Sequence, residues 1–456
     1  MTGSIPAPPA FAHLLPATPA TPLQSLIFKR HAEMSGDAAH YELFIGIELC
    51  GELKESALLA SLHDVVARHE ALRATFHADQ AGIVTFRVHE AGTFVPEFID
   101  LNSLPLGERR SRLNDEVARL RSPFNLERPP CFRAALIRLY PQRYILAIVA
   151  HHISCDGLSL QIILRDVAAR YAQRVADASG PGASVPLPDL TFDLRQSAAR
   201  EHEWVASEDR QALVQRWRDV LRGYEPIKLT ESARYNGRIS SADSVALDIP
   251  HQTVAAMRTA ARSLGVTPFA WFAANTVAWL ARRASKTDIV VDTSVSGRTE
   301  RDRQDAVGCF AMTVPLRVRF TPSTTFAELA VMLRRTVFSA LTAQRILIWD
   351  DVLEDINPSQ LFVFRCEYID TTRQPELLLP GVTTRPLAPT EKTTTRELHF
   401  SLVDHDEGAT LVTHFRTDTY QLAVVHGWAC QIAELLGYAA SVPHAPAAGL
   451  QHDYFL

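Results

Sequence analysis

The first half of the chain alternates between segments with strand periodicity and segments with helix periodicity. Apolar residues occupy every second position from 41 to 49, a pattern typical of a half-buried strand. A helix is predicted at 54–72, where apolar residues recur on one helical face. The unbroken apolar run at 144–149 predicts a strand buried on both faces. An apolar stripe from Leu160 to Tyr171 predicts an amphipathic helix directly after it.

The second half continues the mixed pattern of strands and helices. Pro268 stands where the first residue of a helix is expected, and it opens the apolar segment 268–284. Further strands are predicted at 288–294, 313–320, 361–368, 398–403 and 409–415, and a final helix at 421–438. No internal repeat is present, which argues against a solenoid. The whole pattern predicts an α/β protein.

The length of the chain predicts more than one lobe. With 456 residues it exceeds the size of one typical core, so two lobes are expected. The clearest break in composition is the Gly/Pro-rich segment 178–189, which is typical of a linker. This assigns 1–20 to an extended Pro/Ala-rich lead-in, 21–177 to an N-terminal lobe and 190–456 to a C-terminal lobe.

Charge and composition argue against several classes of function. The net charge is −5, from 46 basic and 51 acidic residues, so nucleic acid and anionic membranes are not expected partners. No apolar run approaches the roughly 20 residues of a bilayer span, and the N-terminus lacks the pattern of a signal peptide. The six cysteines form no CxxC pair, which is typical of a reduced, cytoplasmic protein.

The candidate chemistry lies in residues 151–157, HHISCDG, between the buried strand and the amphipathic helix. Strand side chains alternate between faces, so we expect one of His151 and His152 to pack inward and the other to face a substrate. A neutral imidazole there can accept a proton near pH 7. Asp156 can turn back on the same loop or bind an arginine from elsewhere. Gly157 permits close approach of the backbone and offers an unobstructed N–H.

Other interpretations of this segment are open at this point. A histidine pair can be purely structural. Two histidines and an aspartate can also contribute metal ligands, although the spacing does not supply the rest of a zinc shell. Cys155 stands near a helix start, where a thiol can be activated, but cysteine is also among the most often buried residue types.

The segment HHISCDG resembles the HHxxxDG signature of the condensation domains of nonribosomal peptide synthetases, relatives of chloramphenicol acetyltransferase. Further segments resemble the motifs of that family in the family's order. They are ATPLQ at 20–24, ARHEALRATF at 67–76, SGR at 296–298, VGCF at 307–310, PLR at 315–317 and TD at 417–418. The resemblance covers about residues 15–440. The chain is similar to a free-standing member, although an excised domain would look the same.

The resemblance implies a specific fold and a specific site. Two chloramphenicol acetyltransferase-like lobes are expected to form a V-shaped pseudo-dimer with a tunnel between them, without a bound cofactor or metal. His152 is expected to face the tunnel as the catalytic histidine, with His151 structural. Asp156 is expected to be structural and to pair with Arg298. Gly157 is, by position, a candidate oxyanion donor.

Several segments depart from the family pattern. Met312 stands where the family usually has an asparagine; it and Ser296 are expected on the acceptor side of the tunnel. The HQDxPFE-like motif has no clear counterpart at 343–350, and the YxDYAxW-like motif is at best 191–196. These changes spare the histidine loop, so they question the usual aminoacyl-carrier acceptor and not the reaction type. Ser159 only faintly resembles a phosphopantetheine attachment site.

The resemblance implies direct acyl transfer in natural-product biosynthesis. An acyl or aminoacyl group would move from the phosphopantetheine thioester of a carrier protein to an amine or hydroxyl acceptor, giving an amide or ester. The expected partners are an acyl or peptidyl carrier protein and a small-molecule or carrier-bound acceptor, and the expected state is a monomer. Two alternatives are a catalytically silent domain that recruits a carrier or tailoring enzyme, and an acyl-coenzyme A-dependent acyltransferase of the same superfamily.

Overall fold

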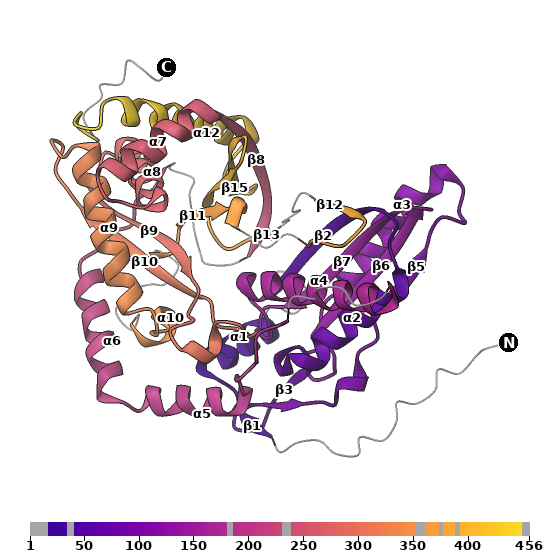
Figure 1. The fold of residues 1–456 in the computed structure, drawn as a ribbon. Coiled ribbons are helices and arrows are strands. Elements are labelled where there is room, and N and C mark those ends of the chain that lie inside the picture. Colours follow the sequence, from indigo (N-terminus) through magenta and orange to yellow (C-terminus); the bar gives the residue numbers. More distant parts are fainter. Residues whose placement is uncertain are drawn as a thin grey trace. The chain divides into compact units, whose positions relative to one another are not determined.

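The computed structural model describes residues 17–33, 41–179, 186–229, 239–352, 361–373, 377–387 and 393–448. The chain divides into two compact units, each assembled from separate stretches of sequence. Unit 1 consists of Met1–Val205, Arg298–Phe310 and Pro375–Pro389. Unit 2 consists of Ala206–Gly297, Ala311–Gln374 and Thr390–Leu456. Both units combine sheets with packed helices, as the α/β prediction requires (Figure 1).

Unit 1 is built on a five-stranded sheet of order β12-β2-β7-β6-β5 and a small sheet of order β1-β4-β3. Its strands are β1 (Thr18–Pro19), β2 (Glu42–Gly51), β3 (Ala74–Ala78), β4 (Val84–Val88), β5 (Glu97–Asp100), β6 (Phe132–Tyr140), β7 (Arg143–His151) and β12 (Val382–Pro386). Its helices are α1 (Pro22–Glu33), α2 (Glu55–Arg68), α3 (Leu106–Leu120), α4 (Gly157–Ser179) and α5 (Leu194–Val205), with 3-10 turns at Glu70–Arg73, Ala91–Thr93 and Arg301–Arg303.

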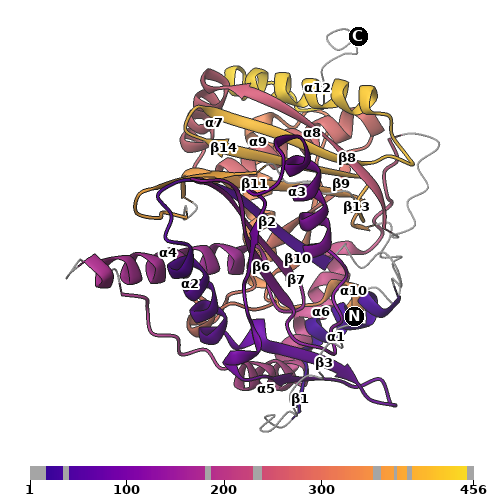
Figure 2. The ribbon, with the colours of Figure 1, turned by 90° about the vertical axis from the view of Figure 1, so that its right-hand side faces the viewer.

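The central strand β7 is buried from its second residue to its end, which confirms the expectation from its unbroken apolar run. It runs antiparallel to β2 and β6. Leu146 and Ile148 pack with residues of α2 and α4, which lie side by side along one face of the sheet (Figure 2). Ile145 and Val149 pack on the other face with residues of α1, α3 and α5. The strand that carries the histidine loop is therefore fixed from both sides.

Unit 2 is built on one seven-stranded sheet of order β10-β9-β11-β14-β15-β8-β13. Its strands are β8 (Ser240–Pro250), β9 (Asp288–Val295), β10 (Met312–Arg319), β11 (Phe364–Asp370), β13 (Thr393–Thr394), β14 (Leu398–His405) and β15 (Gly408–Arg416). Its helices are α6 (Glu208–Leu221), α7 (His251–Ser263), α8 (Pro268–Ala284), α9 (Phe326–Thr342), α10 (Ile348–Asp351) and α12 (Leu422–Ser441), with a 3-10 turn at Thr371–Arg373.

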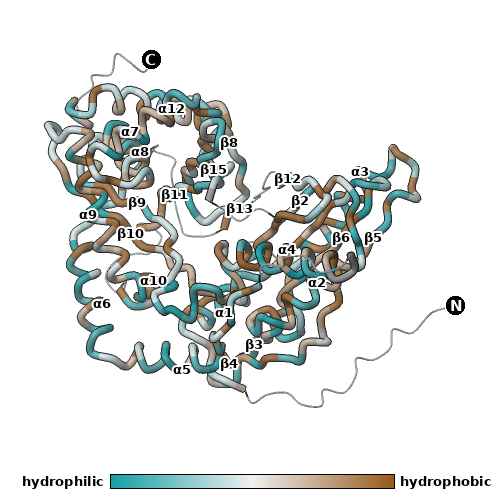
Figure 3. The backbone as a smooth tube through the Cα atoms, viewed as in Figure 1, coloured by the Kyte–Doolittle hydropathy of each residue, from teal (hydrophilic) through white to brown (hydrophobic). Residues whose placement is uncertain are grey.

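Helices α7, α8 and α12 pack on one another and against the unit 2 sheet (Figure 1). Thr267 caps α8 and Pro268 occupies its first turn, as the sequence predicts. Trp279 of α8 packs edge-on against Phe400 of β14 and Trp428 of α12. In Figure 3, β9 and β10 have hydrophobic colours and α6 is largely hydrophilic. Among the described residues no single helix is long and apolar enough to cross a bilayer; α7 and α8 pass only as a pair bent by 104°.

The division into units differs from the expected lobes of 21–177 and 190–456. Helix α5 belongs to unit 1 because Leu194 and Ala198 pack into its core. Two later segments also join unit 1, because Arg298 pairs with Asp156 and β12 pairs with β2. The expected linker 178–189 begins inside α4, and its residues 180–185 lie outside the described residues.

Some element boundaries also differ from the expected ones. Within the lead-in 1–20, residues 1–16 lie outside the described residues, and Thr18–Pro19 pairs with β4. The helix expected at 54–72 ends at Arg68 because His69 adopts an extended conformation, and a 3-10 turn follows. The imidazole of His69 bonds to Asp166 of α4 at 3.0 Å, which holds the break in place.

Candidate active site

The residues of the HHISCDG segment connect the end of β7 to the start of α4. Strand β7 ends at His151 and α4 begins at Gly157. His151 is fully buried, whereas His152 is half-buried. The structure thus buries one histidine and leaves the next half-buried; because β7 ends at His151, His152 stands in the turn after the strand, where strand alternation no longer applies.

The ring of His151 is held on both of its nitrogens. Its Nδ1 accepts the backbone N–H of Ile153 at 3.1 Å, and its Nε2 lies 3.2 Å from Nδ1 of His31. Phe124 meets the ring edge-on, with the centroids 5.9 Å apart. Burial, followed by the neighbouring His31 and His152, holds the pKa of His151 well below its usual value. This histidine is therefore a neutral structural group near pH 7.

The backbone, rather than a side-chain contact, positions His152. Its N–H donates to the carbonyl oxygen of Tyr41 at 2.7 Å. Its Nδ1 is buried and has no hydrogen-bond partner among the described residues. Nothing among the described residues thus fixes Nδ1 of His152 as a donor or an acceptor.

The carboxylate of Asp156 is saturated with hydrogen bonds. Arg298 donates from Nη1 to Oδ2 at 2.8 Å and from Nη2 to Oδ1 at 3.0 Å, and both side chains are 1% exposed. Oδ1 also accepts the N–H of Ser159 at 2.8 Å, as an N-cap of α4 does, and Oδ2 accepts the N–H of Phe310 at 3.1 Å. Burial opposes the charge, but Arg298 and the hydrogen bonds from Ser159 together lower the pKa of Asp156.

Ser159 takes part in the same buried cluster. Its hydroxyl oxygen accepts from the N–H of Gly308 at 3.0 Å and from Nη2 of Arg298 at 2.9 Å. Its own hydrogen has two acceptors in reach, Oδ1 of Asp156 at 2.8 Å and the carbonyl oxygen of Gly308 at 2.9 Å. Because the side chain is fully buried and bonded in this way, the structure gives no support to a phosphopantetheine attachment site at Ser159.

An aromatic ring covers the ion pair. The ring of Phe310 lies over the Arg298 guanidinium, 4.7 Å from centroid to Cζ, and Phe192 meets it edge-on at 5.4 Å. Gly308 makes room for this ring, since a Cβ added there would come within 2.5 Å of it. The VGCF segment therefore owes its glycine and its phenylalanine to packing around Arg298.

Two further residues of the loop differ in exposure. Cys155 is fully buried, and this burial, together with the charge of Asp156, raises the pKa of its thiol well above the usual value. A protonated, buried thiol is not a nucleophile. Gly157 is exposed, and an added Cβ would meet nothing within 4 Å. No contact with the described residues therefore requires a glycine at this position.

The two residues expected on the acceptor side lie at one end of β9 and β10 in unit 2. Ser296 is exposed and follows β9 directly, and Met312 is half-buried and opens β10. Met312 is the cross-strand neighbour of Val295, and the next pair along the ladder is Thr313 with Ser294. The structure thus brings both positions to the same end of one antiparallel pair.

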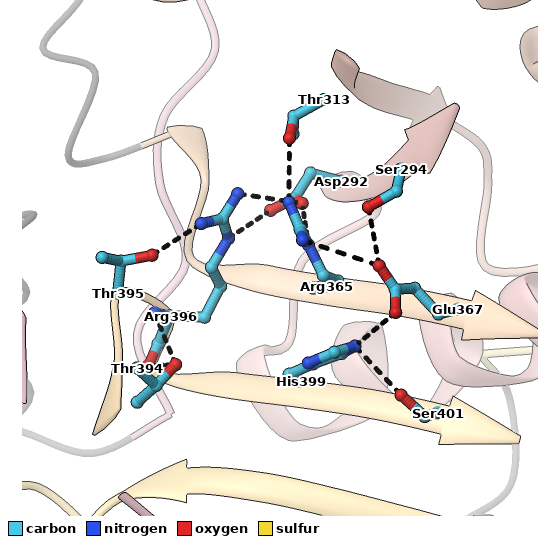
Figure 4. Close-up of polar contacts among 10 residues, drawn as sticks. All are labelled: Asp292, Ser294, Thr313, Arg365, Glu367, Thr394, Thr395, Arg396, His399 and Ser401. Atoms are coloured by element: carbon cyan, nitrogen blue, oxygen red, sulfur yellow. Dashed lines mark hydrogen bonds and ion pairs between the residues drawn. The ribbon is translucent and has the colours of Figure 1, made fainter. Parts of the chain in front are cut away.

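The unit 2 sheet carries a polar network that was not predicted from the sequence (Figure 4). Asp292 is fully buried and accepts from Nε of Arg365 at 2.6 Å and from Nε of Arg396 at 3.2 Å. Glu367 lies 3.1 Å from Nε2 of His399. Burial opposes its charge, but His399 and Arg365 hold the pKa of Glu367 well below its usual range. The network therefore joins two carboxyl groups to two guanidinium groups.

This network reaches the strands that carry the acceptor-side positions. The hydroxyl of Ser294 donates to Glu367 at 2.7 Å, and Nη2 of Arg365 donates to Thr313 at 2.9 Å. His399 lies on the face of β14 opposite to Phe400, which packs against α8, because strand side chains alternate. The only sequence signal is this alternation of polar and apolar residues, whereas the two arginines that pair with Asp292 are 73 and 104 positions away from it.

No group of three His, Cys, Asp or Glu side chains suited to a metal ion occurs in the part of the chain that the structure describes. The described loop offers several protein groups for chemistry. These are the half-buried His152, the exposed N-terminus of α4 at Gly157, and the ion pair that holds the loop.

Comparison with known proteins gives consistent matches. A family model described as Condensation domain matches residues 17–452. CymA, a probable non-canonical nonribosomal peptide synthetase of Salinispora arenicola strain CNS-205, is 28% identical over 445 residues, which are 94% of this chain and 6% of that protein. Malpinin synthetase of Mortierella alpina is 26% identical over 387 residues, which are 83% of this chain and 5% of that protein. The chain thus spans a small part of these curated relatives.

Solved structures match along nearly the whole chain. The X-domain from teicoplanin biosynthesis has a TM-score of 0.79 and 22% identity, covering 97% of this chain and 100% of that one. The first condensation domain of the calcium-dependent antibiotic synthetase, in complex with a substrate analogue, has a TM-score of 0.79 and 20% identity, covering 95% and 98%. These likenesses confirm the expected fold class.

The ion pair predicts a large loss of stability when one partner is removed. Arg298→Met leaves the Asp156 carboxylate buried without its counter-charge, and we expect a loss of about 3–5 kcal/mol in urea unfolding. Arg319→Met is the matched control, because Arg319 is 60% exposed and its ion pair with Asp288 should contribute about 0–1 kcal/mol.

The pH dependence of this loss has a definite sign. The pKa of Asp156 is lower in the folded chain than in the unfolded one, so its stabilisation is present above about pH 4 and is lost as the pH falls through the folded value. The difference in free energy of unfolding between wild type and Arg298→Met should therefore become smaller in acid. A difference that stays constant down to pH 3, or equal effects of Arg298→Met and Arg319→Met, would contradict this account.

Two glycines of the site should respond differently to alanine. Gly308→Ala forces the Phe310 ring away from Arg298, and we expect it to destabilise the protein by about 1–3 kcal/mol. Gly157→Ala meets open space and should change stability by no more than about 0.5 kcal/mol. Thermal unfolding of the two variants measures both effects. Equal effects would show that Gly308 is not required by the packing of Phe310.

Proposed function

Because the chain belongs to the condensation-domain family, whose members generally catalyse amide bond formation, we propose that it is an acyltransferase acting on carrier-bound substrates. The donor is an acyl or aminoacyl group on the phosphopantetheine thioester of a carrier protein. The acceptor is an amine or a hydroxyl group, small or itself carrier-bound. The product is an amide or an ester in natural-product biosynthesis, the setting of the synthetases that the chain resembles.

The observation that carries this proposal is the contrast between the two histidines. His151 is neutral, fully buried and bonded on both ring nitrogens. His152 is half-buried, and its Nδ1 has no partner among the described residues. A chain that needed two structural histidines would gain stability by bonding both, so the second ring is better explained by a role toward a substrate.

The proposed reaction is a direct transfer in which His152 moves one proton. The acceptor nitrogen or oxygen attacks the thioester carbonyl carbon and forms the new C–N or C–O bond. His152 accepts the proton that the nucleophile loses. Collapse of the tetrahedral intermediate breaks the C–S bond, and the leaving thiolate takes a proton back from His152 to become the free phosphopantetheine thiol. Such base catalysis contributes about 10²–10⁴-fold.

The N-terminus of α4 is the proposed site of oxyanion stabilisation. The helix has 23 residues and begins at the exposed Gly157. The first N–H groups of a helix lack intrahelical acceptors, and the helix dipole is positive at this end. The Ser159 N–H is used by Asp156, so the N–H groups of Gly157 and Leu158 remain at this end, and we assign the Gly157 N–H to the oxyanion because it is the first of the helix.

Two other functions need an experimental arm. A domain that recruits a partner is one, since the X-domain from teicoplanin biosynthesis has been solved in complex with OxyB. Transfer from acyl-coenzyme A is the other, since the starter condensation domain of rhizomide synthetase has been solved in complex with C8-CoA and Leu-SNAC. A carrier protein and coenzyme A both present the acyl group as a phosphopantetheine thioester, so His152 would do the same chemistry with either donor.

A single-turnover assay tests the proposal. Acylated carrier proteins and acyl-coenzyme A thioesters are offered separately with pooled amines and alcohols, and products are followed by mass spectrometry. We expect product from a carrier-bound donor with the wild type and a fall of at least about 100-fold with His152→Ala. His63→Ala on α2 is the control for a histidine outside the loop.

Each other outcome of this assay identifies an alternative. Product only from acyl-coenzyme A favours the coenzyme A-dependent acyltransferase. Carrier binding without any product favours recruitment. Transfer that survives intact in His152→Ala would remove this histidine from the mechanism.

Met312 predicts a change in acceptor use. We propose that Met312 and Ser296 line the acceptor side, where the family usually has an asparagine at the position of Met312. Met312→Asn replaces a half-buried apolar side chain by an amide, so the KM for the acceptor should change by about tenfold while the KM for the donor stays within about twofold. Arg319→Met, on the same strand, is the control. Equal changes in both KM values would place Met312 away from the acceptor.

A further inference from the structure

Helix α1 carries three inward-facing residues at helical spacing. Gln24, Ile27 and His31 stand at positions i, i+3 and i+7, which share one face of a helix. Gln24 is 2% exposed and Ile27 is 6% exposed, and His31 is half-buried. Ile27 packs into the same core as Ile153 of the histidine loop. The two polar residues therefore flank an apolar contact between the helix and the loop.

The first end of this face bonds to the loop through Gln24. Its Oε1 accepts the N–H of Thr21 at 3.1 Å, and the hydroxyl of Thr21 accepts the N–H of Gln24 at 3.2 Å, which is a capping box. With Oε1 engaged, the amide orientation is fixed, and Nε2 donates to the carbonyl oxygen of Ile153 at 3.4 Å. The TPLQ segment thus caps the helix and holds the residue after His152.

The other end of the face bonds to the loop through His31. Because Nδ1 of His151 accepts the N–H of Ile153, a neutral His151 carries its proton on Nε2. That proton points to Nδ1 of His31, 3.2 Å away, so a neutral His31 carries its own proton on Nε2. His31 also bonds to the backbone of Phe124. The chain of donors therefore runs in one direction, from Ile153 through His151 and His31.

From this geometry we infer that α1 is a brace for the histidine loop and that His31 is a positioning residue for acyl transfer. His31 fixes the ring of His151, and Gln24 fixes the carbonyl of Ile153, so both neighbours of His152 along the chain are held by one helix. The assignment of a rate effect to His31 rests on the proposed function of His152. The hydrogen-bond chain itself does not.

Protonation of either ring breaks the chain. A proton on Nδ1 of His31 removes the acceptor for His151, and a proton on Nδ1 of His151 removes the acceptor for Ile153. Burial holds the pKa of both rings below the usual value. Both are neutral near pH 7, and the brace is lost as the pH falls through the folded values. Several titratable or charged groups among the described residues surround the two rings. His152 belongs to the same loop, and Tyr41 and Glu42 lie where β2 begins, with Glu42 paired to Arg121. Cys131 and Arg133 lie where β6 begins.

Two substitutions of His31 separate hydrogen bonding from packing. His31→Leu keeps apolar volume but removes the acceptor for His151, whereas His31→Asn can place an amide oxygen close to the position of Nδ1 and does not titrate. We expect the single-turnover transfer rate to fall about tenfold in His31→Leu and to stay within about twofold of wild type in His31→Asn. His63→Leu on α2 is the matched control and should leave the rate unchanged.

The second readout does not need activity. In ¹⁵N-histidine-labelled protein, His151 should show the neutral Nε2–H tautomer in the wild type and in His31→Asn. In His31→Leu the tautomer should persist, because Ile153 still donates to Nδ1, but the Nε2 proton of His151 has lost its acceptor and should exchange with water faster. The acid loss of the tautomer should involve one proton fewer in His31→Asn than in the wild type, because His31 no longer titrates.

The outcomes distinguish the two proposals. If the wild type transfers no acyl group but the Nε2 proton of His151 responds as expected, the brace stands and the proposed reaction is wrong. If His31→Leu transfers at the wild-type rate and leaves the exchange of the Nε2 proton unchanged, His31 does not position the loop. Equal rate losses in His31→Leu and His31→Asn, with unchanged exchange of that proton in both, would show that only packing matters.

Discussion

The buried ion pair between Asp156 and Arg298 is the interaction on which the histidine loop depends. Each charge alone would be strongly unfavourable in a position that is 1% exposed. Together they are acceptable because the guanidinium meets the carboxylate with two nitrogens, and because Ser159 and Phe310 add two backbone N–H groups to the same oxygens. The pair joins the end of the loop, the first turn of α4 and the segment that carries Phe310.

This pair also explains why unit 1 recruits a distant piece of the chain. The chain leaves the unit 2 sheet after β9, contributes Arg298–Phe310 to unit 1 and returns to unit 2 as β10. Arg298, Gly308 and Phe310 each contact the same cluster at Asp156 and Ser159. A purely apolar contact could slide or repack, whereas a bidentate ion pair with directed N–H groups has one good geometry. The charge therefore specifies where the segment docks.

The sequence predicts the parts of this arrangement that depend on local periodicity. The apolar run of β7 is local, and the structure agrees with it, whereas the different burial of His151 and His152 arises where the strand has already ended. The partnership of Asp156 with Arg298 spans 142 positions and was expected only through the family resemblance. The contact of His31 with His151, at a separation of 120, had no such signal. Periodicity encodes which face of an element is buried, but not which distant element covers it.

The partners in the unit 2 network could likewise not be predicted from periodicity. Asp292 lies in an apolar strand, and its side chain finds its partners because β11 and the bend before β14 bring Arg365 and Arg396 to it. These side chains come together because β11 pairs in parallel with β14 and β9, and the pattern of polar and apolar residues does not predict the order of strands in a sheet. The compact units differ from the expected lobes for the same reason, since composition marks a Gly/Pro-rich stretch but not the strand pairing of β12 with β2.

The commitment of Asp156 to Arg298 decides one question that the loop sequence leaves open. An aspartate four residues after a histidine could have turned back to orient that imidazole, as the carboxylate of a catalytic triad does. Both oxygens of Asp156 are instead occupied by Arg298 and by backbone N–H groups. The orientation of His152 must then come from its backbone, held at Tyr41 and through the residues on either side. A rigid loop thus replaces an orienting carboxylate, and the precision of the proposed base depends on what holds that loop.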